Sequence, residues 1–288
     1  MAASNGLVSA PLPRVDESFV DFADSLAVAA GKVIMRYWRL PIEVISKHEE
    51  GRSIAQVESP VTVADRLAET EMRNMIEARY PTHGICGEEH GSVRMDAEYV
   101  WVLDPIDGTK SFITGKPLFG TLVALLHRGV PVVGVIDQCV LKERWIGANG
   151  VTTLNGKPVA AQGVGSLSEA MLYATTPHMF SEGVEEDRFT TLRDMVKRPL
   201  YGCDCYAYAL VASGFGADLV VEADLGIYDY CALVPVLKGA GGRMSDWNGR
   251  ELTLQGFEAC KGRVVAAANQ AIWEQAVEVL RDGGGARP

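Results

Sequence analysis

The stretch VWVLDPIDGTKSF, residues 100–112, joins an apolar run to two aspartates three positions apart. Its apolar start is typical of a buried strand, and it leads directly into Asp104, Asp107, Gly108 and Thr109. Because burying carboxylates at the end of a core strand costs free energy unless a cation meets them, the stretch predicts a cation site. The alternative is a turn in which both carboxylates only cap nearby amides.

A second acidic stretch lies upstream. In GICGEEHG, residues 84–91, Glu88 and Glu89 follow another short apolar run. If the two strands are neighbours, Glu88 lies near Asp104 and Asp107. Clustered carboxylates repel one another unless some are protonated or a hard divalent cation neutralises them, and oxygen ligands without His or Cys favour Mg²⁺ over zinc.

Asp229 opens the helix-like stretch DYCALVPVLKGAGG, where it can cap backbone amides and also point into a cleft. Three segments then supply four carboxylates: Glu88, Asp104, Asp107 and Asp229. Such a set can hold two Mg²⁺ ions, which would activate an attacking water and stabilise a leaving oxygen. Gly108 permits a sharp turn, so its amide and that of Thr109 can face a phosphate oxygen. The Thr109 hydroxyl can hold the water against Glu88.

The composition favours a small-molecule partner. The chain has 288 residues, of which 48% are hydrophobic and 22% charged, enough for one large core or two modest ones. A net charge of -10 argues against nucleic acid or anionic membrane as a partner, and no apolar run approaches the roughly 20 residues that span a bilayer. The six cysteines lack zinc-site spacing and indicate reduced thiols.

Hydrophobic spacing divides the chain into three parts. Residues 1–17 predict a disordered arm, 18–160 an α+β half that carries the main acidic motifs, and 161–288 an α/β half of alternating strands and helices that carries Asp229. The first helix is predicted over residues 18–40, with Asp16 or Ser18 as its cap, and a late helix over 229–240.

Between these helices the sequence predicts a mobile loop or hairpin over residues 43–60, a helix over 61–81 that starts near Thr62 or Asp65, and a β-hairpin that turns at residues 128–131. A further strand over 143–150 extends this hairpin into an antiparallel meander. Lys47 in the charged loop is either a phosphate contact or a solvated side chain.

Three motifs in order resemble the inositol monophosphatase family of Mg²⁺-dependent, lithium-sensitive phosphatases. LDPIDGTKSF resembles the first signature of that family, GEEHG lies where the family places an upstream glutamate, and IYDYCALVPVLKGAGG resembles the second signature, with Tyr228 in place of Trp and Cys231 in place of Ala. The resemblance implies an α/β fold, a layered α-β-α-β-α sandwich of the inositol monophosphatase/fructose-bisphosphatase type. It also implies a homodimer with two or three Mg²⁺ ions per site.

Carried over residue by residue, the resemblance assigns roles to this chain. The implied metal ligands are Glu88, Asp104, the carbonyl of Ile106, Asp107 and Asp229. The implied catalytic residues are Glu88 and Thr109, which position the water, and Asp65, which orders the water network or, alternatively, only starts a helix. The substrate contacts are Asp107, Gly108, Thr109, Asp204, Glu222 and Asp229.

The stretch Gly202-Cys203-Asp204-Cys205 bears on the substrate. An added carboxylate at Asp204, beside Glu222, suits a cationic leaving group better than a neutral polyol, although Asp204 alternatively only caps the following helix. Together with SPVTVADRLAE (residues 59–69) and DPIDGTKSFITGKPLFGTLVALL (residues 104–126), this stretch resembles the plant-type histidinol-phosphate phosphatases of the family. That resemblance implies hydrolysis of L-histidinol phosphate in histidine synthesis. The alternative substrates are inositol or galactose phosphates. The resemblance implies a plastid location in a plant, after removal of a transit peptide, and a cytoplasmic location otherwise.

Overall fold

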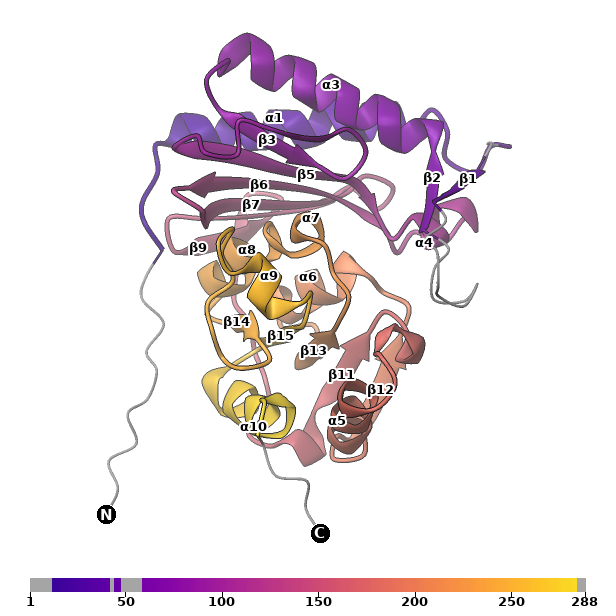
Figure 1. Ribbon diagram of the computed structural model, residues 1–288, viewed down its shortest axis with the longest axis vertical. Coiled ribbons are helices and arrows are strands. Elements are labelled where there is room, and N and C mark those ends of the chain that lie inside the picture. The colour runs from indigo at the N-terminus through magenta and orange to yellow at the C-terminus, as the bar shows by residue number, and fades with distance from the viewer. Residues whose placement is uncertain (1–11, 42–43, 48–58, 284–288) are drawn as a thin grey trace.

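The computed structural model describes residues 12–41, 44–47 and 59–283. Most of the predicted N-terminal arm and most of the predicted loop over 43–60 therefore lie outside the described residues. Within the described ranges the strands form a two-stranded, an eight-stranded and a five-stranded sheet. Figure 1 shows helices α1 and α3 above the eight-stranded sheet, a second helical layer beneath it, then the five-stranded sheet, and α5 and α10 at the far side. The predicted α-β-α-β-α sandwich is confirmed.

The eight-stranded sheet, called the large sheet below, has the order β10-β9-β8-β7-β6-β5-β3-β4. Its β3–β5 pair is parallel, and β5 to β10 form an antiparallel meander that contains the predicted hairpin, β6 and β7, and the predicted next strand, β8. Its strands are β3 (Gly84–Gly87), β4 (Gly91–Val93), β5 (Tyr99–Asp107), β6 (Gly120–His127), β7 (Val130–Gln138), β8 (Glu143–Ala148), β9 (Val151–Leu154) and β10 (Lys157–Val159).

The five-stranded sheet, called the small sheet, has the order β12-β11-β13-β15-β14, with β11 parallel to both β12 and β13. Its strands are β11 (Met171–Ala174), β12 (Arg198–Tyr201), β13 (Leu219–Glu222), β14 (Arg243–Asp246) and β15 (Val264–Ala267). In a separate two-stranded sheet, β1 (Val44–Lys47) pairs antiparallel with β2 (Ser59–Thr62), and Lys47 is the last residue of β1.

The helices connect and cover these sheets. They are α1 (Glu17–Ile34), α3 (Val63–Arg79), α4 (Thr109–Ile113), α5 (Val184–Arg193), α6 (Cys205–Ser213), α7 (Ile227–Tyr230), α8 (Leu233–Gly239), α9 (Phe257–Cys260) and α10 (Gln270–Leu280), with 3-10 turns at Leu167–Glu169 and Pro177–Met179. Local chemistry sets their starts: Asp16 caps α1 by accepting a hydrogen bond from the Ser18 amide, and Thr62 caps α3. Among the described helices, none combines the length and the apolar character needed to cross a bilayer.

Three apolar clusters lie between the layers and supply most of the burial that stabilises the fold. The first packs α1 and α3 on one face of the large sheet and includes Met72 and Trp101. The second packs α6 and α8 on the opposite face and includes Trp145 and Tyr208. The third joins the small sheet to α5 and α10 around Phe189. The second cluster therefore joins the two sheets through helices, and it is this layer that approaches the acidic motifs.

Two predicted helices differ from the structure. The helix predicted over 18–40 ends at Ile34, because Trp38 turns to pack on Phe112 and Phe119 and Arg39 adopts a left-handed φ of 58°. The helix predicted over 229–240 is split into α7 and α8. Pro235 explains the break, since it has no N–H for the carbonyl four residues earlier and its ring crowds that carbonyl.

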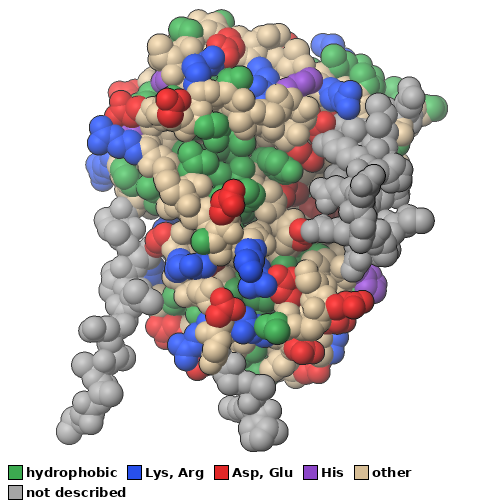
Figure 2. All heavy atoms as spheres, in the orientation of Figure 1, with side chains coloured by type: hydrophobic (Ala, Val, Ile, Leu, Met, Phe, Trp, Pro, Cys, Tyr) green, Lys and Arg blue, Asp and Glu red, His purple; other side chains and the backbone are tan. Residues whose placement is uncertain are grey.

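Other local predictions are confirmed. Arg128 and Gly129 turn the hairpin between β6 and β7 with φ values of 50° and 81°, the left-handed geometry of a tight hairpin turn. All six cysteines lie within the described residues and are free thiols. Figure 2 shows acidic and basic side chains intermixed on the face of the molecule seen in Figure 1.

Candidate active site

Asp104 and Asp107 come together because β5 contains a β-bulge. In a regular strand, side chains three residues apart point to opposite faces. Here the pairing with β6 shifts between Asp104, opposite Leu122, and Asp107, opposite Gly120, so one extra residue lies between them. Pro105, which cannot donate a ladder hydrogen bond, lies within this irregularity. Carboxylate oxygens of Asp104 and Asp107 are consequently within 4.8 Å of each other.

Glu88 reaches the same edge of the large sheet. Gly87 pairs with Leu103 in the parallel β3–β5 ladder, and the Glu88 amide donates a hydrogen bond to the Leu103 carbonyl at 3.2 Å. Glu88 therefore lies beside the residue that precedes Asp104, as expected where the ends of two parallel strands meet. Burial, and next the charge of Glu88, raise the pKa of Asp104 well above its ordinary value.

The C-terminal half contributes Asp229. This residue lies in α7, where its carboxylate accepts a hydrogen bond from the Gly226 amide at 2.6 Å, so it caps a backbone amide as predicted. It also brings an oxygen within 4.8 Å of the carboxylates of Asp104 and Asp107. The same residue thus fixes a turn and completes an acidic cluster.

The three aspartates are a suitable site for a hard cation. Burial, and next the charges of neighbouring carboxylates, raise the pKa of Asp104 and Asp107 well above the ordinary value and that of Asp229 to about 8. Ionising the cluster therefore costs free energy, and a bound divalent cation would offset that cost. The donor oxygens are all carboxylates, the ligand type that Mg²⁺ prefers.

Thr109, Asp65 and the Ile106 carbonyl lie close together. The Thr109 hydroxyl donates to the Ile106 carbonyl at 3.0 Å and lies 3.5 Å from an oxygen of Asp65. The other Asp65 oxygen accepts hydrogen bonds from the amide and the hydroxyl of Thr62, so Asp65 also completes the cap of α3. Burial raises the pKa of Asp65 to about 6. The two interpretations of Asp65, helix start and site residue, are therefore compatible.

The turn at Gly108 packs closely against the side chain of Asp204. Its φ is 85°, and a Cβ atom there would lie 3.0 Å from the carboxyl group of Asp204. Asp204 does not cap α6 with its side chain; its oxygens instead lie 3.3 Å from the Ser111 hydroxyl and 3.5 Å from that of Thr175. Burial, and next the charge of Glu222, raise its pKa to about 7. Asp204 therefore occupies the N-cap position of α6 without a side-chain capping hydrogen bond, and its contact with substrate stays a prediction.

Glu222 is buried at the end of β13. Its side chain is buried, with one oxygen accepting from the Thr175 amide at 2.8 Å and the other from the Tyr208 hydroxyl at 2.7 Å. It therefore ties the end of β13 to β11 and α6, and its charge acts on Asp204. Direct substrate contact by Glu222 stays a prediction.

Comparison with known proteins places the chain in a family. Residues 16–283 match the inositol monophosphatase family. The chain belongs to this family. It is 50% identical over 270 residues to the bifunctional phosphatase IMPL2, chloroplastic, of Arabidopsis thaliana, covering 92% of this chain and 75% of that protein. It is 32% identical over 266 residues to a histidinol-phosphatase of Chlorobaculum parvum, covering 92% of this chain and 97% of that protein.

The solved structures agree with the sequence relatives. An inositol monophosphatase from Zymomonas mobilis superposes with a TM-score of 0.78 at 38% sequence identity, covering 92% of this chain and 98% of that one. The family is metal-dependent, and the acidic cluster of this member could bind a metal. Its departures from the second signature lie beside the cluster: Cys231 is fully buried, and Tyr228 packs partly buried against the core.

Sequence reasoning missed the partners that hold the site residues in place. Ser111 and Thr175 contact Asp204, and the amide of Cys205 donates to Asp107 at 2.6 Å. No spacing in the sequence links these residues, because they come from α4, the end of β11 and the start of α6. Their contribution depends on how the two halves pack.

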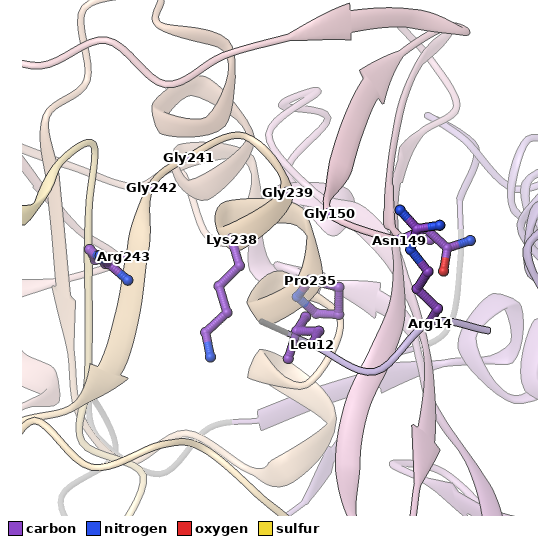
Figure 3. Close-up of a pocket in the computed structure, with 11 residues that line it drawn as sticks. Leu12, Arg14, Asn149, Gly150, Pro235, Lys238, Gly239, Gly241, Gly242 and Arg243 are labelled. Carbon is purple, nitrogen blue, oxygen red and sulfur yellow. The ribbon is translucent and has the colours of Figure 1, made fainter. Parts of the chain in front are cut away.

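A separate cavity of about 390 Å³ lies away from this cluster. Figure 3 shows basic side chains there from the N-terminal segment (Arg14), the end of α8 (Lys238) and the start of β14 (Arg243). None of the candidate site residues lines this cavity, so it is not part of the acidic site.

Proposed function

We propose that the protein is a Mg²⁺-dependent phosphomonoesterase that hydrolyses L-histidinol phosphate to L-histidinol and phosphate. The phosphatase chemistry is supported by the carboxylate cluster and by the family. The substrate is supported by one observation above all: Asp204, at the edge of the cluster, is a carboxylate with two hydroxyl neighbours and a second carboxylate, Glu222, behind it. Such a subsite suits the ammonium and imidazole of histidinol.

The proposal gives a role to each aspartate of the cluster and to the residues around it. The residues that would hold Mg²⁺ are Glu88, Asp104, Asp107, Asp229 and the Ile106 carbonyl. The ion would lower the pKa of a bound water and neutralise phosphate charge. Thr109 and Glu88 orient that water, and Asp65 holds the Thr109 hydroxyl in place. The amides of Gly108 and Thr109 face the phosphate. No residue forms a covalent bond with phosphorus.

The names of relatives agree with the proposed substrate and also supply the competing one. Histidinol-phosphatases match at 32% and 35% identity, whereas the solved relative from Zymomonas mobilis is an inositol monophosphatase. We also propose a homodimer, inhibition by Li⁺, and a plastid location in a plant cell, the last on the strength of the chloroplastic relative.

The deciding experiment measures phosphate release with Mg²⁺ and compares kcat/KM for histidinol phosphate and inositol 1-phosphate. We expect a preference for histidinol phosphate of at least about 100-fold, equivalent to about 2.7 kcal/mol. Asp204→Asn should remove most of that preference, while Asp187→Asn, which removes the same charge from an exposed position of α5, should not. An equal or reversed preference would assign the protein to inositol phosphate hydrolysis.

A further inference from the structure

Glu69 is a buried carboxylate that the proposed chemistry does not use. It lies in α3 one turn after Asp65, and its exposed fraction is 0%. One oxygen accepts a hydrogen bond from the Glu89 amide at 2.8 Å, and the other accepts from the His90 amide at 3.1 Å. Both amides belong to the turn between β3 and β4 that carries Glu88.

The backbone of Glu88 is thereby held on both sides. Its own amide donates to the Leu103 carbonyl, and the next two amides along the chain are bound by Glu69. With the backbone fixed before and after it, the Cα–Cβ direction of Glu88 is fixed as well. Support from the sheet itself is weak here, because β4 is a three-residue edge strand whose residues are all exposed.

Further contacts dock the same turn onto α3. Arg73 donates to Glu69 at 2.7 Å and also to the Gly91 carbonyl, so it spans the carboxylate and the end of the turn. The His90 ring lies 3.1 Å from both the Thr70 hydroxyl and the Arg66 carbonyl. These contacts tie the position of the turn to the position of α3.

The carboxylate of Glu69 lies very close to the backbone of Gly87. A Cβ atom on Gly87 would overlap the carboxylate of Glu69, so a larger residue at this position of β3 would force that carboxylate to move. Asp65 and Glu69 lie on the same face of α3 and contact two different segments. Asp65 contacts Thr109, and Glu69 binds the turn that carries Glu88.

We propose that Glu69 is a positioning residue of the candidate metal site, which aims Glu88 by binding the two amides that follow it. The inference rests on the proposed function, because it assumes that Glu88 is a metal ligand. Residues that orient metal ligands commonly change metal affinity by about 10- to 100-fold when replaced. A residue that only stabilised the fold would lower thermal stability without changing the affinity of the folded protein.

The test compares Glu69→Gln with Glu77→Gln in the full chain. Glu77 lies about two turns further along α3 and pairs with Arg94 at the surface, so its replacement removes the same charge from the same helix without touching the turn. Mg²⁺ binding is measured by calorimetry without substrate, and the Mg²⁺ concentration for half-maximal phosphate release is measured separately. Tm in EDTA reports stability.

We expect Glu69→Gln to weaken Mg²⁺ binding and to raise the half-maximal Mg²⁺ concentration, each by at least about tenfold. Glu77→Gln should leave both within about twofold. Two further variants serve if Glu69→Gln fails to fold. Gly87→Ala pushes the Glu69 carboxylate away from the turn, and Arg73→Lys holds that carboxylate less firmly. Each should also weaken Mg²⁺ binding. Wild-type affinity in a folded variant of this set would overturn the inference.

Failure of the proposed function would give a different pattern. If the wild-type protein binds Mg²⁺ but hydrolyses neither phosphate ester, the proposed activity is wrong, and calorimetry still decides the role of Glu69. If the wild-type protein binds no Mg²⁺ by calorimetry, both the proposed function and the role of Glu69 are wrong.

Discussion

Asp107 accepts a hydrogen bond from the backbone amide of Cys205 at 2.6 Å, so the acidic turn at the end of β5 caps a helix of the other half. The carboxylate satisfies one of the free amides at the start of α6 while it lies within 4.8 Å of Asp104 and Asp229. The contact thus joins the packing of the two halves to the geometry of the acidic cluster.

Asp107→Asn separates these two roles. The amide oxygen can still accept from Cys205, so we expect only a small loss of Tm, whereas loss of the charge should lower kcat/KM by at least about 100-fold by weakening metal binding. The measurement is phosphate release over a Mg²⁺ titration, with Tm recorded in EDTA. Full Mg²⁺-dependent turnover in the variant would contradict the proposed chemistry.

The stability of the metal-free protein should fall as the pH rises. Burial raises the pKa of Asp65 to about 6, of Asp204 to about 7 and of Asp229 to about 8, all from 3.8. The folded protein therefore holds these protons more tightly than the unfolded chain. Their stabilising contribution is complete below about pH 4 and is lost as the pH passes through the raised values.

We expect Tm in EDTA to drop by several degrees between about pH 5.5 and about pH 8.5, and Mg²⁺ to oppose the drop because it binds the ionised carboxylates. Asp229→Asn should flatten the EDTA curve, since it removes the group with the pKa of about 8. A Tm in EDTA that rises over this range would show that the cluster is already ionised in the folded state.

Gly108→Ala should impair catalysis beyond its effect on stability. The substitution places a Cβ atom 3.0 Å from the carboxyl group of Asp204 and forces alanine to a φ of 85°, which costs about 1–2 kcal/mol. Gly156→Ala is the matched control, because Gly156 has a φ of 77° and open space around it. Both variants should lose similar Tm, and only Gly108→Ala should lose kcat/KM. Equal activity in the two variants would exclude a role for the contact with Asp204.

Gly134→Ala should destabilise the packing of α8 on the large sheet. Gly134 and Gly147 are cross-strand partners, and a Cβ atom on Gly134 would overlap the carbonyl of Ala232 just before α8. We expect a loss of at least about 2 kcal/mol in the free energy of unfolding, measured by denaturant titration. Gly165→Ala, in open space, should change it by less than about 0.5 kcal/mol. Comparable losses in both variants would argue against this close approach.

Much of the site could be predicted from the sequence because its chemistry is local. The apolar run before Asp104, the Gly-Thr pair after Asp107 and the caps at Asp16 and Thr62 depend on residues within a few positions of one another. The same holds for the tight hairpin at Arg128 and Gly129. The end of the first helix could not be predicted in this way, because it depends on where Trp38 finds aromatic partners.

Local patterns in the chain were enough to predict the acidic residue set, the hairpin of β6 and β7 with the strand that follows it, and the family. Three features of the site depend on packing between distant segments: the bulge that turns Asp104 and Asp107 toward each other, the hydroxyl neighbours of Asp204, and the hold of Glu69 on the turn of Glu88. The physical reason is the same in each case. Hydrogen bonds between residues far apart in the chain form only once the strands and helices that carry them have packed, and no local propensity encodes that proximity.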